Sequence, residues 1–217
     1  MAKRHLLLVM MGVLALPLAA AQRVPVQQNP DACQGPRVDA PVGALCGVQK
    51  TVAGRSVNAY LGIPYAESTA GSHRFRPPVP EPHWSGVRDA SAFGPVCPQT
   101  GTAVKGLPSS EDCLSINVWT PAAAKPKPAS FVDELARLKA QTGAGGSAPS
   151  TGRPVLVFLY GGGFVHGASS QQLYPGGPSL YDGARMAATQ GIVVVTLNYR
   201  VGVLGFLAGA PGVTPNL

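Results

Sequence analysis

Several patterns that would assign a chemistry are absent from this 217-residue chain. It contains no Gly-x-Ser-x-Gly, the pattern that presents a nucleophilic serine on a sharp strand-to-helix turn. It also contains no Cys-x-x-Cys, and its histidines do not stand at zinc-binding spacing near the cysteines. These absences argue against a serine nucleophile of that kind in the chain. They also predict no bound metal and no cofactor.

A dense block of lysine and arginine is missing as well. The chain carries 17 basic and 10 acidic residues, for a formal net charge of +7, but the basic residues are scattered. Nucleic-acid-binding proteins gather such charges on one face or along one helix, whereas scattered charges are ordinary surface charge. We therefore expect no nucleic-acid partner.

No apolar run is long enough to span a membrane. Basic residues 3–4 precede an apolar stretch over residues 6–18, and three alanines follow, ending at Ala21. The uncharged part of this segment is 16 residues long, short of the roughly 20 that a spanning helix needs, and Pro17 interrupts it. The pattern predicts that residues 1–21 are a secretory signal cleaved near Ala21. The protein is then exported, secreted or periplasmic, without a stable membrane anchor.

Four cysteines follow this segment: Cys33, Cys46, Cys97 and Cys113. An even number in an exported chain suggests two disulfides, and four cysteines allow three pairings. The local pairing, Cys33–Cys46 and Cys97–Cys113, is favoured because each pair encloses a loop that contains glycine or proline. Closing a loop of about 15 residues is worth roughly 3 kcal/mol in the chain-entropy model.

The 27 glycines and 22 prolines predict many turns and loops around a folded core. Residues 22–46 are rich in proline, glutamine and aspartate and are predicted to be an irregular mature amino terminus. The folded domain is predicted over 47–217. Within it, residues 122–153 combine a proline cluster, a short amphipathic helix over 131–141 and a Gly/Ser/Ala/Pro linker, which predicts a surface insertion.

The remaining periodicity predicts an α/β fold. Strands are expected over residues 57–65, 114–119, 154–160 and 192–199, and a helix over 182–188 that stops at Gly191. Apolar strands on either side of a helix indicate a sheet covered on both faces. We expect the strand at 192–199 to lie at an unpaired edge of an incomplete sheet, where it would promote aggregation.

Three consecutive glycines, Gly161 to Gly163, directly follow the expected strand over 154–160. Glycines let a backbone turn where side chains would clash, and they let N–H groups approach a bound group closely. Backbone N–H donors placed in this way after an early strand hold the oxyanion of acyl transfer in α/β hydrolases.

Four runs, in the same order along the chain, together resemble the type-B carboxylesterases, a family that includes the cholinesterases. The runs are Gly-Ile-Pro-Tyr-Ala at 62–66, Ser-Glu-Asp-Cys-Leu with Asn-Val-Trp-Thr-Pro within 110–121, Tyr-Gly-Gly-Gly-Phe at 160–164 and Asn-Tyr-Arg-Val-Gly at 198–202. The resemblance covers roughly residues 47–217. It implies the amino-terminal part of an α/β-hydrolase sheet, with an antiparallel start followed by strand, helix and strand.

The resemblance also implies roles for individual residues. Gly162 and Gly163 would be oxyanion-hole donors, and Gly161 would give the turn its freedom. Arg74 would form a structural ion pair with Glu111. The family pattern further supports the Cys97–Cys113 bridge, whereas the Cys33–Cys46 pairing rests on spacing alone. The loop between Cys97 and Cys113 has no tryptophan, which argues against choline esters as substrates.

Other candidate nucleophiles and bases are weaker. Ser56 lacks the second glycine of the elbow pattern, and Gln171 breaks that pattern after Ser169 and Ser170. His166 lies near the glycine loop, but without a paired acid it is better interpreted as structural or solvated. The family's triad of serine, acid and histidine is therefore absent from these residues.

Two functional interpretations remain open. In the first, the chain is the amino-terminal part of an exported serine esterase that cleaves small carboxylic esters through an acyl-enzyme, and it is inactive alone. In the second, it belongs to a non-catalytic, cholinesterase-like binding or adhesion protein. A lipase-like relative is disfavoured by the runs at 110–114 and 198–202.

Overall fold

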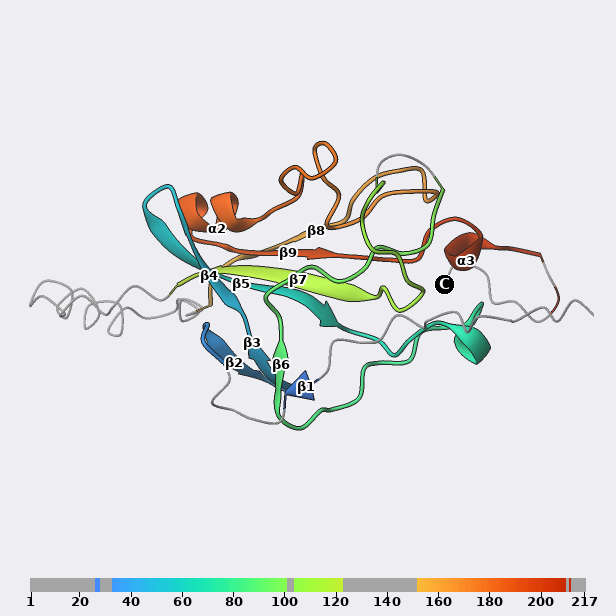
Figure 1. Ribbon diagram of the computed structural model, residues 1–217, viewed down its shortest axis with the longest axis horizontal. Coiled ribbons are helices and arrows are strands. Elements are labelled where there is room, and N and C mark those ends of the chain that lie inside the picture. Colours follow the sequence, from blue (N-terminus) through green and yellow to red (C-terminus); the bar gives the residue numbers. More distant parts are fainter. Residues whose placement is uncertain (1–25, 28–32, 101–103, 123–151, 210, 212–217) are drawn as a thin grey trace, which may run out of the picture.

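The computed structural model describes residues 26–27, 33–100, 104–122, 152–209 and 211. Two β-sheets and a few short helices make up these residues (Figure 1). The smaller sheet has the order β1-β6-β3-β2, with β1 at Val26–Gln27, β6 at Val87–Asp89, β3 at Gly43–Cys46 and β2 at Arg37–Ala40. The larger sheet has the order β4-β5-β7-β9-β8, with β4 at Val48–Val52, β5 at Arg55–Pro64, β7 at Ser115–Pro121, β9 at Val193–Leu197 and β8 at Val155–Phe158.

The predicted fold class is confirmed. Strands β4, β5, β7 and β9 pair antiparallel in succession, and β8 then joins β9 in parallel. Helix α2, at Ala184–Gln190, lies between β8 and β9 in the chain and ends at Gly191, whose φ of +69° is the left-handed conformation that glycine adopts at low cost. A 3₁₀ turn, η2 at Gly71–His73, and helix α3 at Val203–Phe206 complete the described elements.

Helix α2 covers one face of the larger sheet, and the smaller sheet lies on the other side (Figure 1). Trp119 of β7 is fully buried beneath α2, beside three alanines of that helix, which let it approach closely. The helix is also tied down at its start. The Asp182 carboxylate accepts from the Ala184 N–H at 2.8 Å and pairs with Lys50 of β4 at 3.0 Å.

Strand β5 contributes to the hydrophobic clusters on both faces because it contains a β-bulge. Tyr60 pairs with Val118 and Ile63 pairs with Ile116, so β5 holds one residue more than β7 between these pairs. Gly62, at φ +65°, occupies the bulge, and its N–H donates to Asn117 Oδ1 at 2.9 Å. Before the bulge, alternate β5 side chains face α2; after it, Ile63 faces the smaller sheet together with Tyr60.

Two expectations are wrong in detail. Part of the region predicted to be irregular, 22–46, forms strands β2 and β3, which pair in a hairpin; the chain reverses between them at residues 41–42. The strand expected over 192–199 is not an edge either, because β9 lies between β7 and β8. The edge strand on this side of the described sheet is β8, which precedes β9 in the chain, and β4 is the edge strand on the other side.

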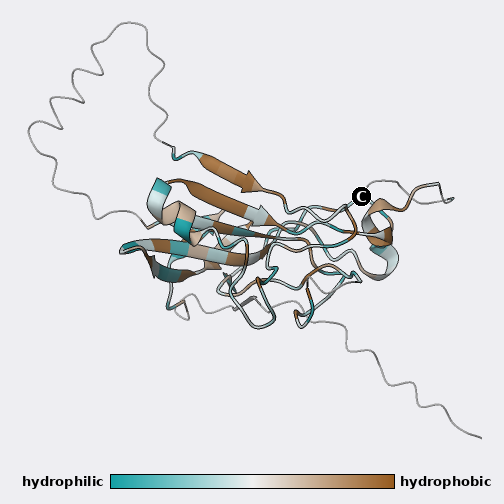
Figure 2. Ribbon diagram, turned by 90° about the horizontal axis from the view of Figure 1, so that it is seen from above, coloured by the Kyte–Doolittle hydropathy of each residue, from teal (hydrophilic) through white to brown (hydrophobic). Residues whose placement is uncertain are grey.

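Strand β8 is apolar and exposed along its whole length (Figure 2). Val155 is 60% and Val157 55% exposed, and among the described residues no strand pairs with the outer side of β8. An apolar edge strand without charge or proline to protect it is a template for association with another strand.

The structure contains the local disulfide pairing, Cys33–Cys46 and Cys97–Cys113, with Cα–Cα distances of 5.5 and 5.0 Å. The predicted signal at 1–21 and most of the predicted insertion, including its helix at 131–141, lie outside the described residues. Within the part of the chain that is described, no helix is long and apolar enough to cross a membrane. The same part holds no group of three or more His, Cys, Asp or Glu residues placed to bind a metal ion.

Candidate functional site

The three glycines lie just beyond the carboxyl end of β8, where the chain leaves the sheet. Because β8 and β9 run parallel, the segment that follows β9 leaves the sheet at the same end, where the carboxyl ends of both strands lie. The two segments meet there. The Gly202 N–H donates to the Phe164 carbonyl at 2.7 Å, and the ring centroids of Phe164 and Phe206 lie 4.8 Å apart. This edge of the sheet is where α/β folds place their ligands.

Tyr160 and Tyr199 fix the start of the glycine loop. Their rings stack with centroids 4.4 Å apart. Tyr160 Oη donates to the Tyr199 carbonyl at 3.0 Å, and Tyr199 Oη donates to the Tyr160 carbonyl at 2.7 Å. Burial raises the pKa of the Tyr160 hydroxyl above its usual value, so it remains a neutral donor at ordinary pH. We name this pair the tyrosine clamp.

The loop backbone needs glycine at two of its three positions. Gly162 has φ +145°, and a Cβ there would lie 1.9 Å from the His166 carbonyl oxygen. Gly163 has φ +60° but has open space around it. Gly161 has no positive φ, and apart from its chain neighbours no atom lies within 4 Å of the point that a Cβ would occupy. The interpretation that Gly161 provides the freedom of the turn is therefore wrong, because Gly162 and Gly163 adopt the conformations that side chains disfavour.

The N–H groups of the three glycines have no acceptor among the described residues. The Gly162 carbonyl, in contrast, accepts from the N–H groups of Val165 and His166 at 3.1 and 3.2 Å. The Gly162 carbonyl is thus bonded within the loop, while the three glycine N–H groups have no acceptor from the described residues. Neighbouring unoccupied N–H donors, held by a fixed backbone, are suited to hold an anionic oxygen.

The far end of the loop is held by Gln99. Its side-chain amide donates to the Gly167 carbonyl at 2.8 Å and accepts from the Gly167 N–H at 2.7 Å. A Cβ at Gly167 would lie 2.5 Å from the Tyr160 ring, so the two ends of the loop pack against each other. Sequence reasoning missed both Gln99 and the tyrosine clamp; the only signal was that Tyr160 and Tyr199 fall within runs that match the family.

A buried polar network continues inward from the loop. Asn198 Oδ1 accepts from the backbone N–H and the hydroxyl of Ser169, both at 2.9 Å, and Asn117 Nδ2 donates to Ser169 Oγ at 3.0 Å. Asn117 also donates to Thr196 at 3.0 Å. A buried network whose polar groups are hydrogen-bonded in this way favours a single arrangement of the side chains at this end of the sheet.

The other candidates do not assemble into a catalytic group. Ser169 and Ser170 are buried, and Ser169 is held in the network just described. Ser56 lies at the exposed start of β5, on a different part of the sheet. The His166 side chain is exposed and has no hydrogen bond or ion pair to any described residue. These positions therefore bring together no serine, base and acid.

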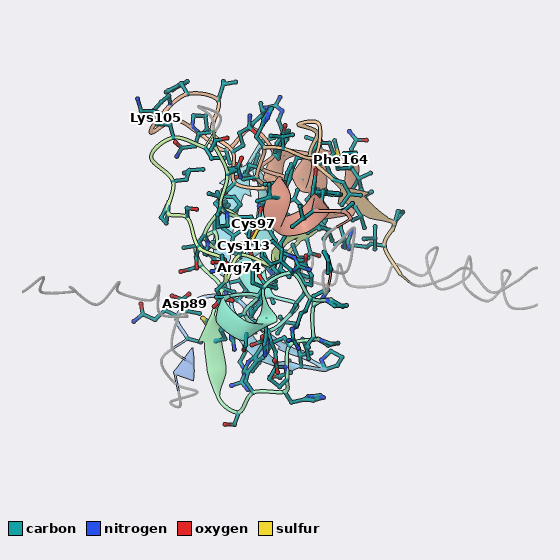
Figure 3. All side chains as sticks on the ribbon, turned by 90° about the vertical axis from the view of Figure 1, so that its right-hand side faces the viewer. Arg74, Asp89, Cys97, Lys105, Cys113 and Phe164 are labelled. Carbon is teal, nitrogen blue, oxygen red and sulfur yellow. A yellow bond between two sulfur atoms is a disulfide. The ribbon has the colours of Figure 1, made fainter. Side chains whose placement is uncertain are left out.

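Arg74 and Glu111 form an ion pair beside the Cys97–Cys113 disulfide (Figure 3). Arg74 Nε donates to Glu111 Oε2 at 2.6 Å, and Arg74 Nη2 donates to Glu111 Oε1. The hydrogen bonds to Glu111 raise the pKa of the Arg74 guanidinium. The pair joins two loops that are 37 residues apart in the chain, so it acts as a structural cross-link and lies outside the glycine loop.

A cavity of about 690 Å³ lies elsewhere, between the Cys33–Cys46 disulfide and the start of β4. None of its lining residues comes from the glycine loop. The cavity therefore lies apart from the glycine N–H groups. We assign the candidate site to the glycine loop, because its N–H donors and its fixed backbone suit an anionic ligand.

Comparison with known proteins agrees with this geometry. A model of the carboxylesterase family matches residues 34–216. The chain belongs to the carboxylesterase family. Carboxylesterase 3 of Pongo abelii is 37% identical over 194 residues, which cover 83% of this chain and 28% of the relative. Carboxylesterase 3 of Homo sapiens is 35% identical over 213 residues, or 92% of this chain and 31% of the relative.

A relative with a different kind of name is also similar. Neuroligin-3 of Mus musculus is 33% identical over 224 residues, covering 91% of this chain and 24% of the relative. The chain spans under a third of the length of each of these three relatives. The match therefore places the chain in the carboxylesterase family.

Proposed function

We propose that this chain provides the oxyanion-holding part of an ester hydrolase that works through an acyl-enzyme, with Gly162 and Gly163 as the N–H donors. One observation carries the proposal: the N–H groups of the glycine loop have no acceptor among the described residues, while both ends of the loop are locked by the tyrosine clamp and by Gln99. Donors fixed before the reaction stabilise a developing negative charge without the cost of reorganisation.

The substrate class follows from the family and the chemistry. Carboxylesterase relatives support small carboxylic esters as substrates of the complete protein. The sequence contains no Gly-x-Ser-x-Gly, and the described serines, histidines and acids assemble no triad, so we expect the chain alone to bind an anion at the loop without turning over an ester. Removing a whole triad leaves only the contribution of the oxyanion hole and of binding.

Export belongs to the same proposal. The two disulfides support it, because such bonds persist in oxidising compartments. We propose that the mature chain begins after a signal cleaved near Ala21 and that residues 122–153 form a surface insertion.

The first test is anion binding at the glycine loop. The chain, labelled with ¹⁵N-glycine, is titrated with phenylphosphonate, a tetrahedral anion that imitates the charge of the acyl-transfer intermediate. We expect saturable shifts of the Gly162 and Gly163 amides. Gly162→Ala should abolish the response, because its Cβ would meet the His166 carbonyl, and Gly161→Ala should keep it. Shifts that are absent in the parent chain, or equal in both variants, would overturn the proposal.

The second test concerns turnover. The chain is incubated with p-nitrophenyl acetate and, separately, with an organophosphate that labels active serines. We expect neither hydrolysis above the background rate nor stoichiometric labelling. Turnover together with a labelled serine would show that the nucleophile lies within these residues and would refute the proposed division of the machinery.

A non-catalytic binding protein is the second candidate, favoured by the similarity to neuroligin-3, whose name is not that of an esterase. The phosphonate titration separates the two candidates. A loop that serves only as a turn in a binding scaffold has no reason to take up a tetrahedral anion, so unchanged amides in a folded chain would favour the binding protein.

A further inference from the structure

The side chain of Gln99 connects the region of the Cys97–Cys113 disulfide with the far end of the glycine loop. Its Nε2 donates to the Cys97 carbonyl at 3.0 Å and to the Gly167 carbonyl at 2.8 Å. Its Oε1 accepts from the Gly167 N–H at 2.7 Å. One planar amide therefore holds both polar backbone groups of Gly167.

The segment that carries Gln99 is itself fixed in place. Cys97 forms its disulfide in the interior, where it is only 2% exposed (Figure 3). The N–H of Val96 donates to the Pro108 carbonyl at 2.8 Å, and the carbonyl of Val96 accepts from the Ser110 N–H at 3.0 Å. Gln99 therefore reaches the glycine loop from a backbone that is held on its own account.

Gly167 passes this constraint on to the three glycines. It has φ +124°, and a Cβ there would lie 2.8 Å from the Gly161 carbonyl oxygen, which therefore lies directly against Gly167. The Gly161 carbonyl and the Gly162 N–H belong to the same peptide unit. Because the C=O and N–H of a trans peptide point in opposite directions, the Gly162 N–H points away from Gly167.

The direction of the Gly163 N–H depends on a different contact. This N–H shares its peptide unit with the Gly162 carbonyl, which accepts from the N–H groups of Val165 and His166. Those hydrogen bonds lie within the loop and do not involve Gln99. A change at Gln99 should therefore act on the Gly162 N–H before it acts on the Gly163 N–H.

We propose that Gln99 is a positioning residue of the oxyanion site. Through Gly167 and the Gly161 carbonyl it sets the direction of the Gly162 N–H, and with it the affinity of the loop for a tetrahedral anion. The inference rests on the proposed function of the glycine loop. Gln99 acts through Gly167, since its own amide is occupied by backbone groups.

The first experiment compares Gln99→Ala with Gln172→Ala in the phenylphosphonate titration. Gln172 is the matched control because it is half-buried like Gln99 and also accepts from a glycine N–H, that of Gly176 at 2.8 Å, outside the glycine loop. We expect Gln99→Ala to raise the dissociation constant about tenfold, because a displaced donor loses most of its hydrogen bond to the charged oxygen. Gln172→Ala should bind like the parent.

The outcomes of this titration separate the inference from the proposed function. No response in the parent chain would overturn the proposed function. A parent that binds the phosphonate no more tightly than Gln99→Ala would overturn the positioning role alone. Equal weakening in Gln99→Ala and Gln172→Ala would also overturn that role, because the effect would then not depend on the contact with the loop.

The direction of the Gly162 N–H is also measured without a ligand. In the free chain, labelled with ¹⁵N-glycine, Gln99→Ala should shift the Gly162 amide more than the Gly163 amide. The Gly167 amide should exchange with solvent faster, because it loses its acceptor. An unmoved Gly162 amide would refute the coupling whether or not the parent binds phosphonate.

A pH profile of Gln99→Glu distinguishes positioning from general stability and remains informative if Gln99→Ala does not fold. A neutral carboxylic acid offers Gly167 one donor and one acceptor, as the amide does, whereas a carboxylate only accepts. We expect weak binding near neutral pH and an approach to the parent as the pH falls through the pKa of the introduced carboxyl, ordinarily about 4.3. Dividing each dissociation constant by that of the parent at the same pH removes the titration of the phosphonate and of groups common to both chains. A ratio that does not change with pH would contradict the role of the paired hydrogen bonds.

Discussion

Tyr160 and Tyr199 each donate a hydroxyl hydrogen bond to the other's backbone carbonyl, at 3.0 and 2.7 Å, while their rings stack. Tyr160 precedes the glycine loop, and Tyr199 follows β9. The clamp therefore joins the two segments that leave the sheet at the same edge. A loop that must present free N–H groups gains its fixed position from side chains at its ends, since its own residues have none to offer.

Removing either hydroxyl should loosen this junction. We expect Tyr160→Phe and Tyr199→Phe each to lower the free energy of unfolding by about 1 kcal/mol, because each leaves a carbonyl unpaired. Since the two bonds belong to one stacked unit, the double variant should lose less than the sum. Urea unfolding measures all three, with Tyr174→Phe on the exposed surface as the control. Strictly additive losses would contradict the idea of a single unit.

The Arg74–Glu111 cross-link should contribute to stability without affecting the glycine loop. We expect Glu111→Ala to lower the thermal midpoint, because the loops beside the Cys97–Cys113 disulfide lose their ion pair, and to leave the phosphonate response of Gly162 unchanged. Asp39→Ala is the matched control, because the Arg37–Asp39 pair is exposed and joins residues only two apart. Equal midpoints for Glu111→Ala and the parent would refute the cross-link.

The outer edge of β8 should make the chain associate. We expect Val157→Lys to reduce light scattering and the sedimenting fraction at a given protein concentration, since a charge on an edge strand opposes pairing with a second strand. Val203→Lys places the same charge on an exposed valine of α3, away from the sheet edge. If both substitutions reduce scattering equally, net charge and not the strand edge is responsible.

Alkaline pH should destabilise the fold through Tyr65. Burial raises its folded pKa from the ordinary 10.0 to about 12, so the folded state keeps a proton that the unfolded state has released. The stabilisation is complete below pH 10 and is lost as the pH rises from 10 through about 12. Urea midpoints between about pH 8 and 11 should fall less steeply for Tyr65→Phe than for the parent. Parallel slopes would show that Tyr65 does not contribute.

Much of the larger sheet could be predicted from the sequence because its strands follow simple patterns. The alternation in β7 buries Ser115, Asn117 and Trp119 on successive inward positions. The stop of α2 at Gly191 follows from the freedom of glycine at positive φ. The position of the glycine loop beyond β8 follows from the apolar run that precedes it.

The rest depends on contacts between distant residues. Chain order alone does not reveal that β8 lies outside β9, since a helical crossover between parallel strands fixes their pairing but not which of them β7 will join. The reciprocal bonds of Tyr160 with Tyr199 and of Gln99 with Gly167 join residues 39 and 68 apart. Strands β2 and β3 were missed because proline and polar residues around them conceal a short hairpin.

The bulge at Gly62 divides β5 into two parts, and the side chains of the second part alternate out of step with those of the first. Without the bulge, strict alternation over the same residues would turn Ile63 toward α2, the side that Leu61 faces. The side chains beyond it would change face together. A single insertion that looks like an irregularity therefore determines which half of the molecule the Gly-Ile-Pro-Tyr segment belongs to.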